Sequence, residues 1–322
     1  MEILSDVLRA IRLNGAIFFD VEATSPWVIE SPPIEEIGRL VMPGAEHVIG
    51  FHALLAGSCW VEFADGPAPL RLDAGDVLIL PSGVRHSLCS APGMRSEPDL
   101  DVYQRPAERP LPFVLRKGGT GTDLAHFMCG YFGCDARPFN PLLDALPPVI
   151  HAARHATRAG WVAQLIEAAL GESRALRSGR EIVLARLSEL LFVEVLRGHL
   201  ETVPETTGGW LSGLRDRHVG AALRLIHARP AEDWTLDSLA RAVGVSRSVL
   251  AERFTHHVHL PPMHYLGRWR LQLAARLLEQ PGTNVAQVAE QVGYESEAAF
   301  SRAFKKLIGS PPGAWRRNRH AA

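Results

Sequence analysis

The sequence predicts an α+β protein of two domains, in which a β-barrel or sandwich precedes an all-helical domain. Three features of the 322-residue chain indicate this fold class. Short apolar runs with period-2 alternation, separated by Gly, Pro and Asp, extend from about Phe18 to Phe132. From Pro141 the apolar residues change to the spacing of helices. Beyond Leu214, two stretches share one layout, with Gly244 and Gly293 at equivalent positions.

The composition is that of a soluble globular protein, with 47% hydrophobic and 21% charged residues. The first residues, "MEILSDVLRAIRLNG", carry charges throughout their apolar pattern, so they predict neither a signal peptide nor a membrane span. The four cysteines are not densely spaced, which favours free thiols in a reducing compartment. We therefore expect a cytoplasmic protein with no membrane partner.

The net charge of -1 conceals an uneven distribution. Residues 214–322 hold 16 Lys and Arg against 9 Asp and Glu, which gives +7, whereas residues 1–213 hold 18 against 26, which gives -8. A basic segment is typical of a nucleic-acid partner, because each phosphate contact releases condensed counterions. An ordinary solvated surface is the alternative.

The first expected domain, residues 1–140, is a barrel whose strands include "HVIGFHALLAG" and "AGDVLILPSGVRHSLC". Residues 141–204 follow as a helical segment with the long amphipathic stretch "REIVLARLSELLFVEVLRGHL". Its apolar stripe is broader than one barrel needs to cover, which predicts a homodimer through Val183, Leu184, Leu187, Leu190, Leu191 and Val195.

A linker is expected at residues 205–213, because "ETVPETTGG" (residues 201–209), which leads into it, has Pro, Thr and Gly and no periodicity. Trp210 at its end is flanked by Gly208, Gly209 and Gly213. We expect Trp210 to occupy a docking surface between the domains. Packing of this side chain on its own helical domain is the alternative.

The repeated stretches of residues 214–322 each predict two short helices joined by a glycine turn. Gly244 and Gly293 allow the left-handed backbone that such a turn needs. Ser246 and Ser296 stand where a hydroxyl can cap the second helix. Each pair is expected to pack as a helix-turn-helix through Leu239, Ala240, Val243, Val249, Leu250 and Phe254, and through Val288, Ala289, Val292, Phe300 and Phe304.

A longer helix, "PPMHYLGRWRLQLAARLLEQ", separates the two pairs. Its apolar stripe comprises Tyr265, Leu266, Trp269, Leu273 and Leu277. If this helix is rigid, it places both second helices on one side of a duplex, in major grooves about one helical turn (~34 Å) apart.

At these residues the chain resembles a known family. "VAEQVGYESEAAFSRAFKKLIGSPPGAWRR" resembles the signature of AraC/XylS-type transcription regulators, and the first helix pair with the joining helix resembles the rest of their DNA-binding domain, here 214–322. "GDVLILPSGVRH" resembles a second cupin motif through Gly75, Pro81, Gly83 and His86. "CGYFGCDARPFNPLLDALPPVIH" resembles the junction that follows a sensor domain of the cupin_6 type.

The resemblance implies an effector-responsive activator. Such regulators bind a small-molecule effector in a cupin-like barrel, pair through helices beside it, bind a double-stranded DNA operator and recruit RNA polymerase. The fold class thus becomes α+β, with a cupin-like barrel, a helical dimerisation segment and an all-α domain with two helix-turn-helix motifs.

The resemblance also places the DNA contacts. Arg302 is the strongest expected reader, since Arg can bond both O6 and N7 of guanine; a solvated helix face is the alternative. Glu252 departs from the usual basic or amide reader, and would accept from cytosine N4 or repel phosphate. The whole expected set is Ser246, Arg247, Ser248, Ala251 and Glu252 in the first motif and Ser296, Ala298, Ser301, Arg302, Lys305 and Lys306 in the second, with the two lysines reaching phosphates.

The expected effector pocket contains His52, Trp60, His86 and Cys129. A metal-binding cupin would have a ligand Glu where this chain has Gly50, but His52 lies two residues on and therefore on the same face of the strand. Two imidazoles and a thiolate could hold zinc or another divalent metal. The alternative is that His52 and His86 are hydrogen-bonded pocket residues and Cys129 is a small buried apolar group.

Two other functions stay open. A metal-dependent cupin enzyme fused to a DNA-binding domain is disfavoured by Gly50, and the chain has no nucleophile elbow, phosphate loop or dinucleotide fingerprint, so we expect no enzymatic activity. A redox-switched regulator would use Cys59, Cys89, Cys129 and Cys134, provided that a thiol is exposed and has a lowered pKa.

Overall fold

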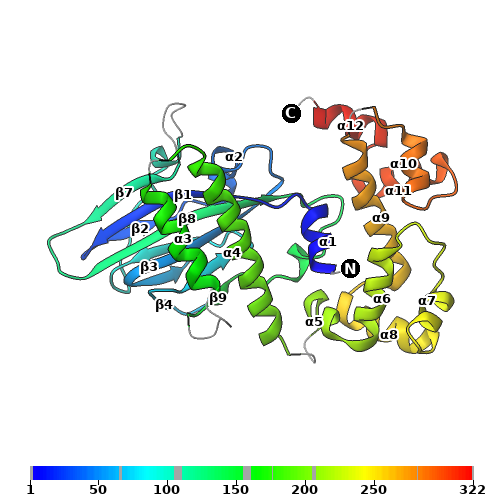
Figure 1. Ribbon diagram of the computed structural model, residues 1–322, viewed down its shortest axis with the longest axis horizontal. Coiled ribbons are helices and arrows are strands. Elements are labelled where there is room, and N and C mark those ends of the chain that lie inside the picture. Colours follow the sequence, from blue (N-terminus) through cyan, green and yellow to red (C-terminus); the bar gives the residue numbers. More distant parts are fainter. Residues whose placement is uncertain are drawn as a thin grey trace. The chain divides into compact units, whose positions relative to one another are not determined.

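A computed structural model of the protein describes residues 3–64, 67–104, 111–154, 161–175, 177–204, 208–280 and 282–320. The chain forms two compact units (Figure 1). The barrel unit contains residues 13–134 and 146–202, and the helical unit contains residues 1–12, 135–145 and 203–322. This division differs from the expected one, because 1–12 and 135–145 join the C-terminal helices. Residues 155–160 and 176 of the expected helical segment, and 205–207 of the expected linker, lie outside the described residues.

A curled β-sheet forms the barrel unit, as predicted. Its strands follow the order β2-β6-β3-β8-β1-β7, while β4 and β5 also pair with β3, and β9 pairs with β5. Only β1 and β7 are parallel among the pairs described. The strands are β1 (Asn14–Thr24), β2 (Val28–Glu30), β3 (His47–Phe63), β4 (Leu70–Asp73), β5 (Val77–Leu80), β6 (His86–Cys89), β7 (Phe113–Gly118), β8 (Leu124–Cys134) and β9 (Ile150–Ala152).

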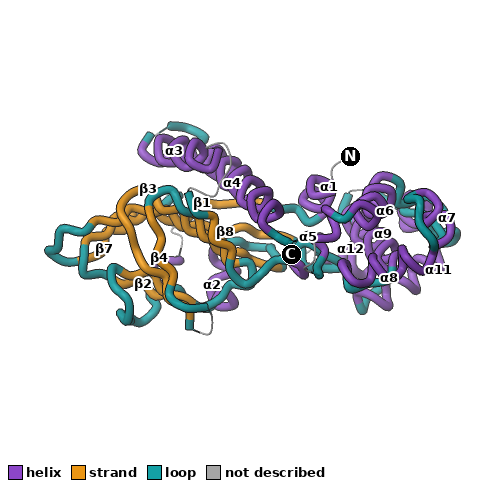
Figure 2. The backbone as a smooth tube through the Cα atoms, turned by 90° about the horizontal axis from the view of Figure 1, so that it is seen from below, coloured by secondary structure: helices purple, strands orange, loops and turns teal. Residues whose placement is uncertain are grey.

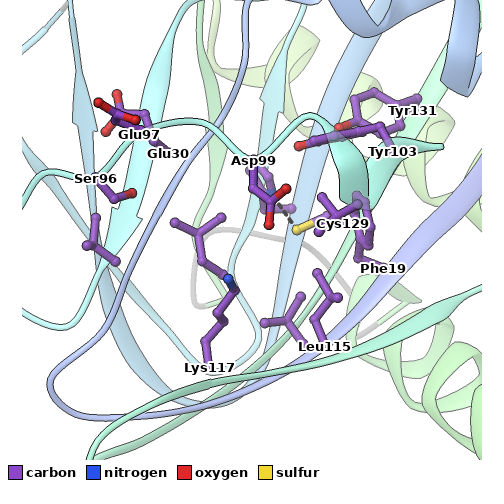
Figure 3. Close-up of a pocket in the computed structure, with 15 residues that line it drawn as sticks. Phe19, Glu30, Ser96, Glu97, Asp99, Tyr103, Leu115, Lys117, Cys129 and Tyr131 are labelled. Atoms are coloured by element: carbon purple, nitrogen blue, oxygen red, sulfur yellow. Dashed lines mark hydrogen bonds between the residues drawn. The ribbon is translucent and has the colours of Figure 1, made fainter.

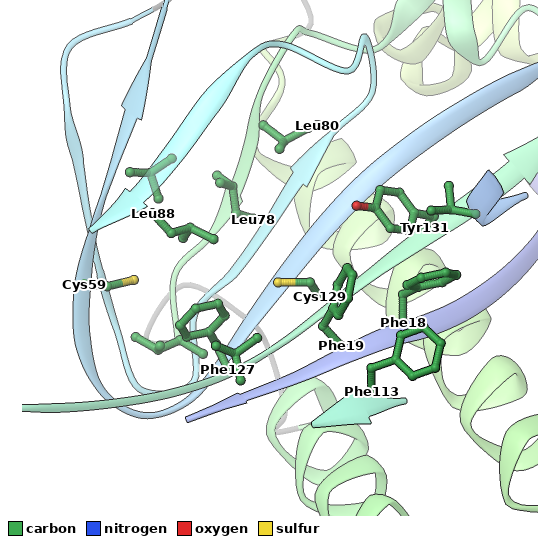
Figure 4. Close-up of a cluster of buried hydrophobic side chains, with 14 of the residues drawn as sticks. Phe18, Phe19, Cys59, Leu78, Leu80, Leu88, Phe113, Phe127, Cys129 and Tyr131 are labelled. Atoms are coloured by element: carbon green, nitrogen blue, oxygen red, sulfur yellow. The ribbon is translucent and has the colours of Figure 1, made fainter. Parts of the chain in front are cut away.

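The sheet curls because β3 changes partners along its length. Its first part pairs with β5 and β8, and its last part pairs with β4 and β6. At the change, Gly57 has a φ of +75°, and a Cβ there would lie 1.8 Å from the Leu124 carbonyl oxygen. The unit's apolar core is a cluster that extends from Phe18 and Phe113 past Phe127 to Leu88 (Figure 4).

Helices cover the other face of the sheet. α3 (Trp161–Arg174) and α4 (Arg180–Thr202) lie side by side on it (Figures 1 and 2). α2 (Ile34–Val41) and the short η1 (Asp101–Tyr103) complete the unit. The apolar side chains of α4 fall into two groups. Leu184 and Leu191 are buried, whereas Val183 and Leu190 are 42% and 53% exposed.

The helical unit contains both predicted helix pairs and the helix between them. The pairs are α7 with α8 and α10 with α11, and α9 joins them. The helices are α1 (Ile3–Ala10), η2 (Leu143–Ala145), α5 (Trp210–Arg215), α6 (Arg217–Ala228), α7 (Leu236–Ala242), α8 (Arg247–Val258), α9 (Pro262–Leu278), α10 (Val285–Gln291), α11 (Glu297–Ile308) and α12 (Pro312–His320). No helix of the described residues combines the length and apolarity that crossing a bilayer requires.

The predicted turns and caps are confirmed. Gly244 and Gly293 have φ values of +76° and +85°. The Ser246 hydroxyl accepts from the Val249 amide and the Ser296 hydroxyl from the Ala299 amide, so each caps its helix. The predicted core of the two pairs is also found, with two departures: Val243 is only half-buried, and Val249 was assigned to the interior but is 42% exposed.

Trp210 packs inside the helical unit, on α9. It is 3% exposed, and its Nε1 donates to the Tyr265 hydroxyl over 3.0 Å. Tyr265 in turn lies 2.9 Å from Nε2 of His227 on α6. The structure therefore supports the alternative interpretation of Trp210, as a core residue of its own unit.

Gln272 of α9 holds the two additional segments of the helical unit. Its side chain is buried, its Oε1 accepts from the Phe139 amide at 3.0 Å, and its Nε2 donates to the Ala10 carbonyl at 2.9 Å. Arg12 adds ion pairs to Asp135 at 2.6 Å and to Glu279 at 2.8 Å. α1 and residues 135–145 are thus fixed on the helix that joins the two helix-turn-helix pairs.

Candidate nucleic-acid interface and barrel pocket

α11 presents a basic face to solvent. Phe300 and Phe304 are fully buried, so the helix packs by one side. On the opposite side Ala298, Arg302 and Lys305 follow each other at i, i+4 and i+7 and are all exposed. Arg302, Lys305 and Lys306 form no ion pair within the part of the chain that the structure describes. Their charges are therefore available to a phosphate backbone or to a guanine edge.

α8 presents a face with less positive charge. Leu250 and Phe254 are buried, Ser248 and Glu252 are exposed, and Ala251 is half-buried. Arg247, at the start of the helix, pairs with Asp237 at 3.3 Å. The exposed Val249 was not expected at the interface, because the helical pattern assigned it to the core. An apolar side chain at this position suits the methyl group of thymine.

Asp216 fixes the back of α8. Its carboxylate caps α6 by accepting from the amides of His218 at 2.9 Å and Val219 at 2.8 Å, and it accepts from the Arg253 guanidinium. Burial by itself would raise the pKa of Asp216, but these hydrogen bonds lower it below its ordinary value. The Arg253 guanidinium is therefore engaged in this ion pair within the helical unit. Asp216 and Arg253 are far apart in the chain, so no local pattern predicted this pair.

The barrel unit contains a cavity of about 60 Å³. It is bounded by residues of β1, β2, β7 and β8, by His52 of β3 and by part of the 96–103 segment (Figure 3). Of the four expected pocket residues, His52 and Cys129 line it. His86 lies behind His52, and Trp60 does not line this cavity. Strand alternation explains the correction for Trp60: its neighbours Cys59 and Val61 belong to the inner core, so Trp60 points to the other face.

His52, His86 and Cys129 form a buried hydrogen-bonded chain. His52 Nδ1 lies 2.9 Å from Cys129 Sγ, and His52 Nε2 lies 2.7 Å from His86 Nε2. His86 Nδ1 lies 2.8 Å from the Val84 carbonyl, to which it must donate. His86 Nε2 then accepts from His52, and His52 Nδ1 accepts from the Cys129 thiol. Ser31 Oγ also lies 3.1 Å from His86 Nε2, and both rings are neutral in this arrangement.

The pKa values agree with neutral groups. Burial lowers the pKa of His86 to about 4, and burial together with the neighbouring His86 holds the pKa of His52 well below its ordinary value. Burial also raises the pKa of the Cys129 thiol well above its usual range. The sulfur and the His86 nitrogen face opposite edges of the His52 ring, so the three groups do not converge on one metal position. Among the described residues no set of three His, Cys, Asp or Glu is arranged to hold a metal ion.

All four cysteines are buried, and none forms a disulfide in the described part of the chain. Burial raises the pKa of Cys59 to about 12 and that of Cys89 to about 11. A thiol with a raised pKa contains little thiolate at neutral pH, and thiolate is the form that reacts with oxidants. These environments weigh against the redox-switch interpretation.

Comparisons with known proteins agree with the two-unit architecture. Residues 2–201 match the Cupin family model Cupin_6, and residues 239–318 match that of a helix-turn-helix domain. A putative AraC-like transcription regulator of Streptomyces lividans is 33% identical over 321 residues, which is 99% of each chain. The HTH-type transcriptional regulator AlkR of Acinetobacter baylyi is 30% identical over 318 residues, covering 98% of this chain and 99% of the relative. The solved C-terminal domain of AraT, a response regulator from Geobacillus stearothermophilus, is 31% identical and matches 31% of this chain and 84% of its own with a TM-score of 0.30.

Proposed function

Since the chain belongs to the AraC-like transcription regulators with a cupin domain and is a DNA-binding transcription regulator, we propose that it is an effector-responsive activator that reads its operator mainly through α11. The observation that supports this proposal is that Ala298, Arg302 and Lys305 are exposed along one face of α11, whereas the other face of the helix is buried. In this proposal Arg302 reads a guanine, and Lys305 and Lys306 bind phosphates. α8 contributes Ser248, Ala251 and Glu252. Ser246 and Arg247 stand at the start of α8, Ser296 at the start of α11, and Ser301 lies beside Arg302 within α11.

The effector would bind in the barrel cavity and act through β1 and β8, the two strands that supply Phe19, Val21, Cys129 and Tyr131 to its lining. β1 starts two residues after Arg12, and β8 ends directly before Asp135. The Asp135 amide donates to the Ile11 carbonyl at 2.8 Å, and Arg12 pairs with both Asp135 and Glu279. A ligand that shifts β1 and β8 would therefore displace the adjoining segments, residues 3–12 and 135–145, which are held on α9.

The same proposal places this protein in the cytoplasm as a homodimer that recruits RNA polymerase, and it assigns no catalytic step to the barrel. The exposed apolar side chains of α4 support the dimer. Ile182, Val183 and Leu190 are 62%, 42% and 53% exposed on a helix whose other side covers the sheet. Paired α4 helices would remove these side chains from water.

DNA binding by two variants tests the base-reading assignment. An operator is selected from a random duplex pool with the full-length protein, and affinities are measured over a range of salt. Arg302→Ala should cost about 1–3 kcal/mol and relax the preference at one base pair. Lys305→Ala should weaken binding to all sequences and reduce the salt slope by about one. Arg39→Ala on α2 removes an exposed cation outside the helical unit and serves as the control. A uniform loss of affinity in both test variants would mean that Arg302 is not a reader.

A further inference from the structure

The barrel cavity carries more negative than positive charge. Its lining includes the carboxylates of Glu30, Glu97 and Asp99 and one ammonium group, that of Lys117. None of the four forms an ion pair within the described part of the chain. Even if Lys117 balances one carboxylate, two negative charges remain at the pocket.

One carboxylate oxygen at this pocket has no partner. Oε2 of Glu30 is buried and accepts no hydrogen bond from the residues that the structure describes. A buried carboxylate oxygen without a donor is costly, and the cost is removed when a cation or a donor reaches it. The Glu30 Oε2 atom is thus left unsatisfied by the residues that the structure describes.

The opposite end of the cavity is aromatic, and Asp99 lies between it and the two glutamates. In Figure 3 Glu30 and Glu97 lie at one end, and Phe19, Tyr103 and Tyr131 lie at the other. The two tyrosines hydrogen-bond to each other, and burial raises both of their pKa values, so both stay neutral. Aromatic faces bind apolar groups and also attract cations. The pocket therefore has an apolar end and an acidic end.

We propose that the effector is a hydrophobic organic ammonium ion, with its cationic group between Glu30 and Glu97 and its apolar part against Phe19, Tyr103 and Tyr131. This inference rests on the proposed function, in which the cavity is the effector site. The inference adds to that function the sign of the charge that the ligand carries. An anionic ligand would add a third unbalanced negative charge, and a neutral one would leave the Glu30 oxygen unsatisfied unless it donated a hydrogen bond.

Three probes of similar shape and different charge test the proposal on the full-length chain by calorimetric titration at low salt: phenethylammonium, 2-phenylethanol and 3-phenylpropanoate. The cation should bind about tenfold more tightly than the alcohol, a factor equivalent to about 1.4 kcal/mol, and the anion more weakly than the alcohol. Glu30→Gln and Glu97→Gln should each remove most of the preference for the cation and leave binding of the alcohol unchanged. Glu97 is exposed, so its variant keeps the test valid if Glu30→Gln perturbs folding.

Glu36→Gln is the matched control, because it makes the same change of charge at an exposed position of α2 that does not line the cavity. Equal binding of the three probes, preference for the anion, or the same loss of preference in the control would overturn the proposal. The proposal would also be overturned if none of the three probes binds. Operator binding, measured on the same samples without a probe, separates these results from a failure of the proposed function.

Discussion

Replacing Gln272 by Leu tests whether α1 and residues 135–145 are structural parts of the helical unit. Leu is close in size to Gln and favours a helix equally, so α9 itself should persist. The change removes the acceptor of the Phe139 amide and the donor to the Ala10 carbonyl, both of which are buried. Both extra segments would lose their shared attachment to α9.

The expected loss follows from these two groups. Each buried backbone group left without its partner costs about 1–3 kcal/mol. The apolar Leu side chain returns about 1–2 kcal/mol, because the Gln amide no longer has to be desolvated and more apolar surface is buried. Two such groups together cost about 2–6 kcal/mol, so the midpoints of the two terms predict that the free energy of unfolding of the helical unit falls by about 2.5 kcal/mol.

Urea unfolding of the full-length protein measures this loss, and hydrogen exchange locates it. Amides of residues 3–12 and 135–145 should exchange faster in Gln272→Leu, whereas those of α10 and α11 should keep their protection. Gln280→Leu makes the same chemical change at an exposed position just after α9 and should have little effect. If Gln272→Leu unfolds at the wild-type midpoint and both segments keep their protection, the assignment of these segments to the helical unit is incorrect.

Three more outcomes are expected. Gly244→Ala should destabilise the chain by about 1 kcal/mol, because it replaces a glycine in the left-handed conformation. Gly293→Ala should cost about 3 kcal/mol, because in addition its Cβ would lie 2.7 Å from backbone atoms. Equal unfolding midpoints of the two variants would contradict this. The pKa of Asp216 is lower in the folded state, so its carboxylate stabilises the fold fully at pH values above its pKa in the unfolded chain, and this stabilisation is lost as the pH falls through its pKa in the folded state. In urea titrations from neutral to acidic pH, the difference in unfolding free energy between wild type and Asp216→Asn should therefore shrink towards low pH. Leu190→Asp should yield folded monomers by light scattering, with a melting temperature lowered only by the loss of the dimer contact, whereas Leu191→Asp, at a buried site, should unfold the barrel unit; a Leu190→Asp dimer would argue against the α4 interface.

Local patterns were enough to predict the helix pairs but not the segments that join them. Gly244, Ser246 and their counterparts Gly293 and Ser296 act within one turn of the chain, so their residue types reveal their conformations. Gln272 stands next to apolar stripe residues of α9, and nothing near it in the sequence indicates partners at positions 10 and 139. Such contacts depend on tertiary packing, which a periodicity argument does not describe.

The barrel pocket shows the same limit. Strand alternation and motif spacing placed His52 and His86, but they did not show that Cys129 lies opposite His52 on β8 or how the three groups hydrogen-bond. Trp60 is eight residues after His52, so simple alternation puts both on one face; the β-bulge between Leu54 and Ala56 reverses the alternation and turns Trp60 to the other face. The carboxylates of Glu30 and Glu97 belong to separate segments that meet only in the folded unit, so their shared position at one end of the cavity could not be predicted.

The attachment of α1 and residues 135–145 also bears on how an effector could control DNA binding. Coupling between two sites requires a ligand to bind one arrangement better than another, and such coupling amounts to about 1–3 kcal/mol. The contacts of Gln272 and Arg12 hold the segments on α9 with an energy of similar size, so binding in the barrel could loosen or tighten them without unfolding either unit. Gln272→Leu should then leave operator affinity unchanged and abolish its dependence on the ligand. A variant that keeps the full ligand response would show that the signal does not pass through these segments.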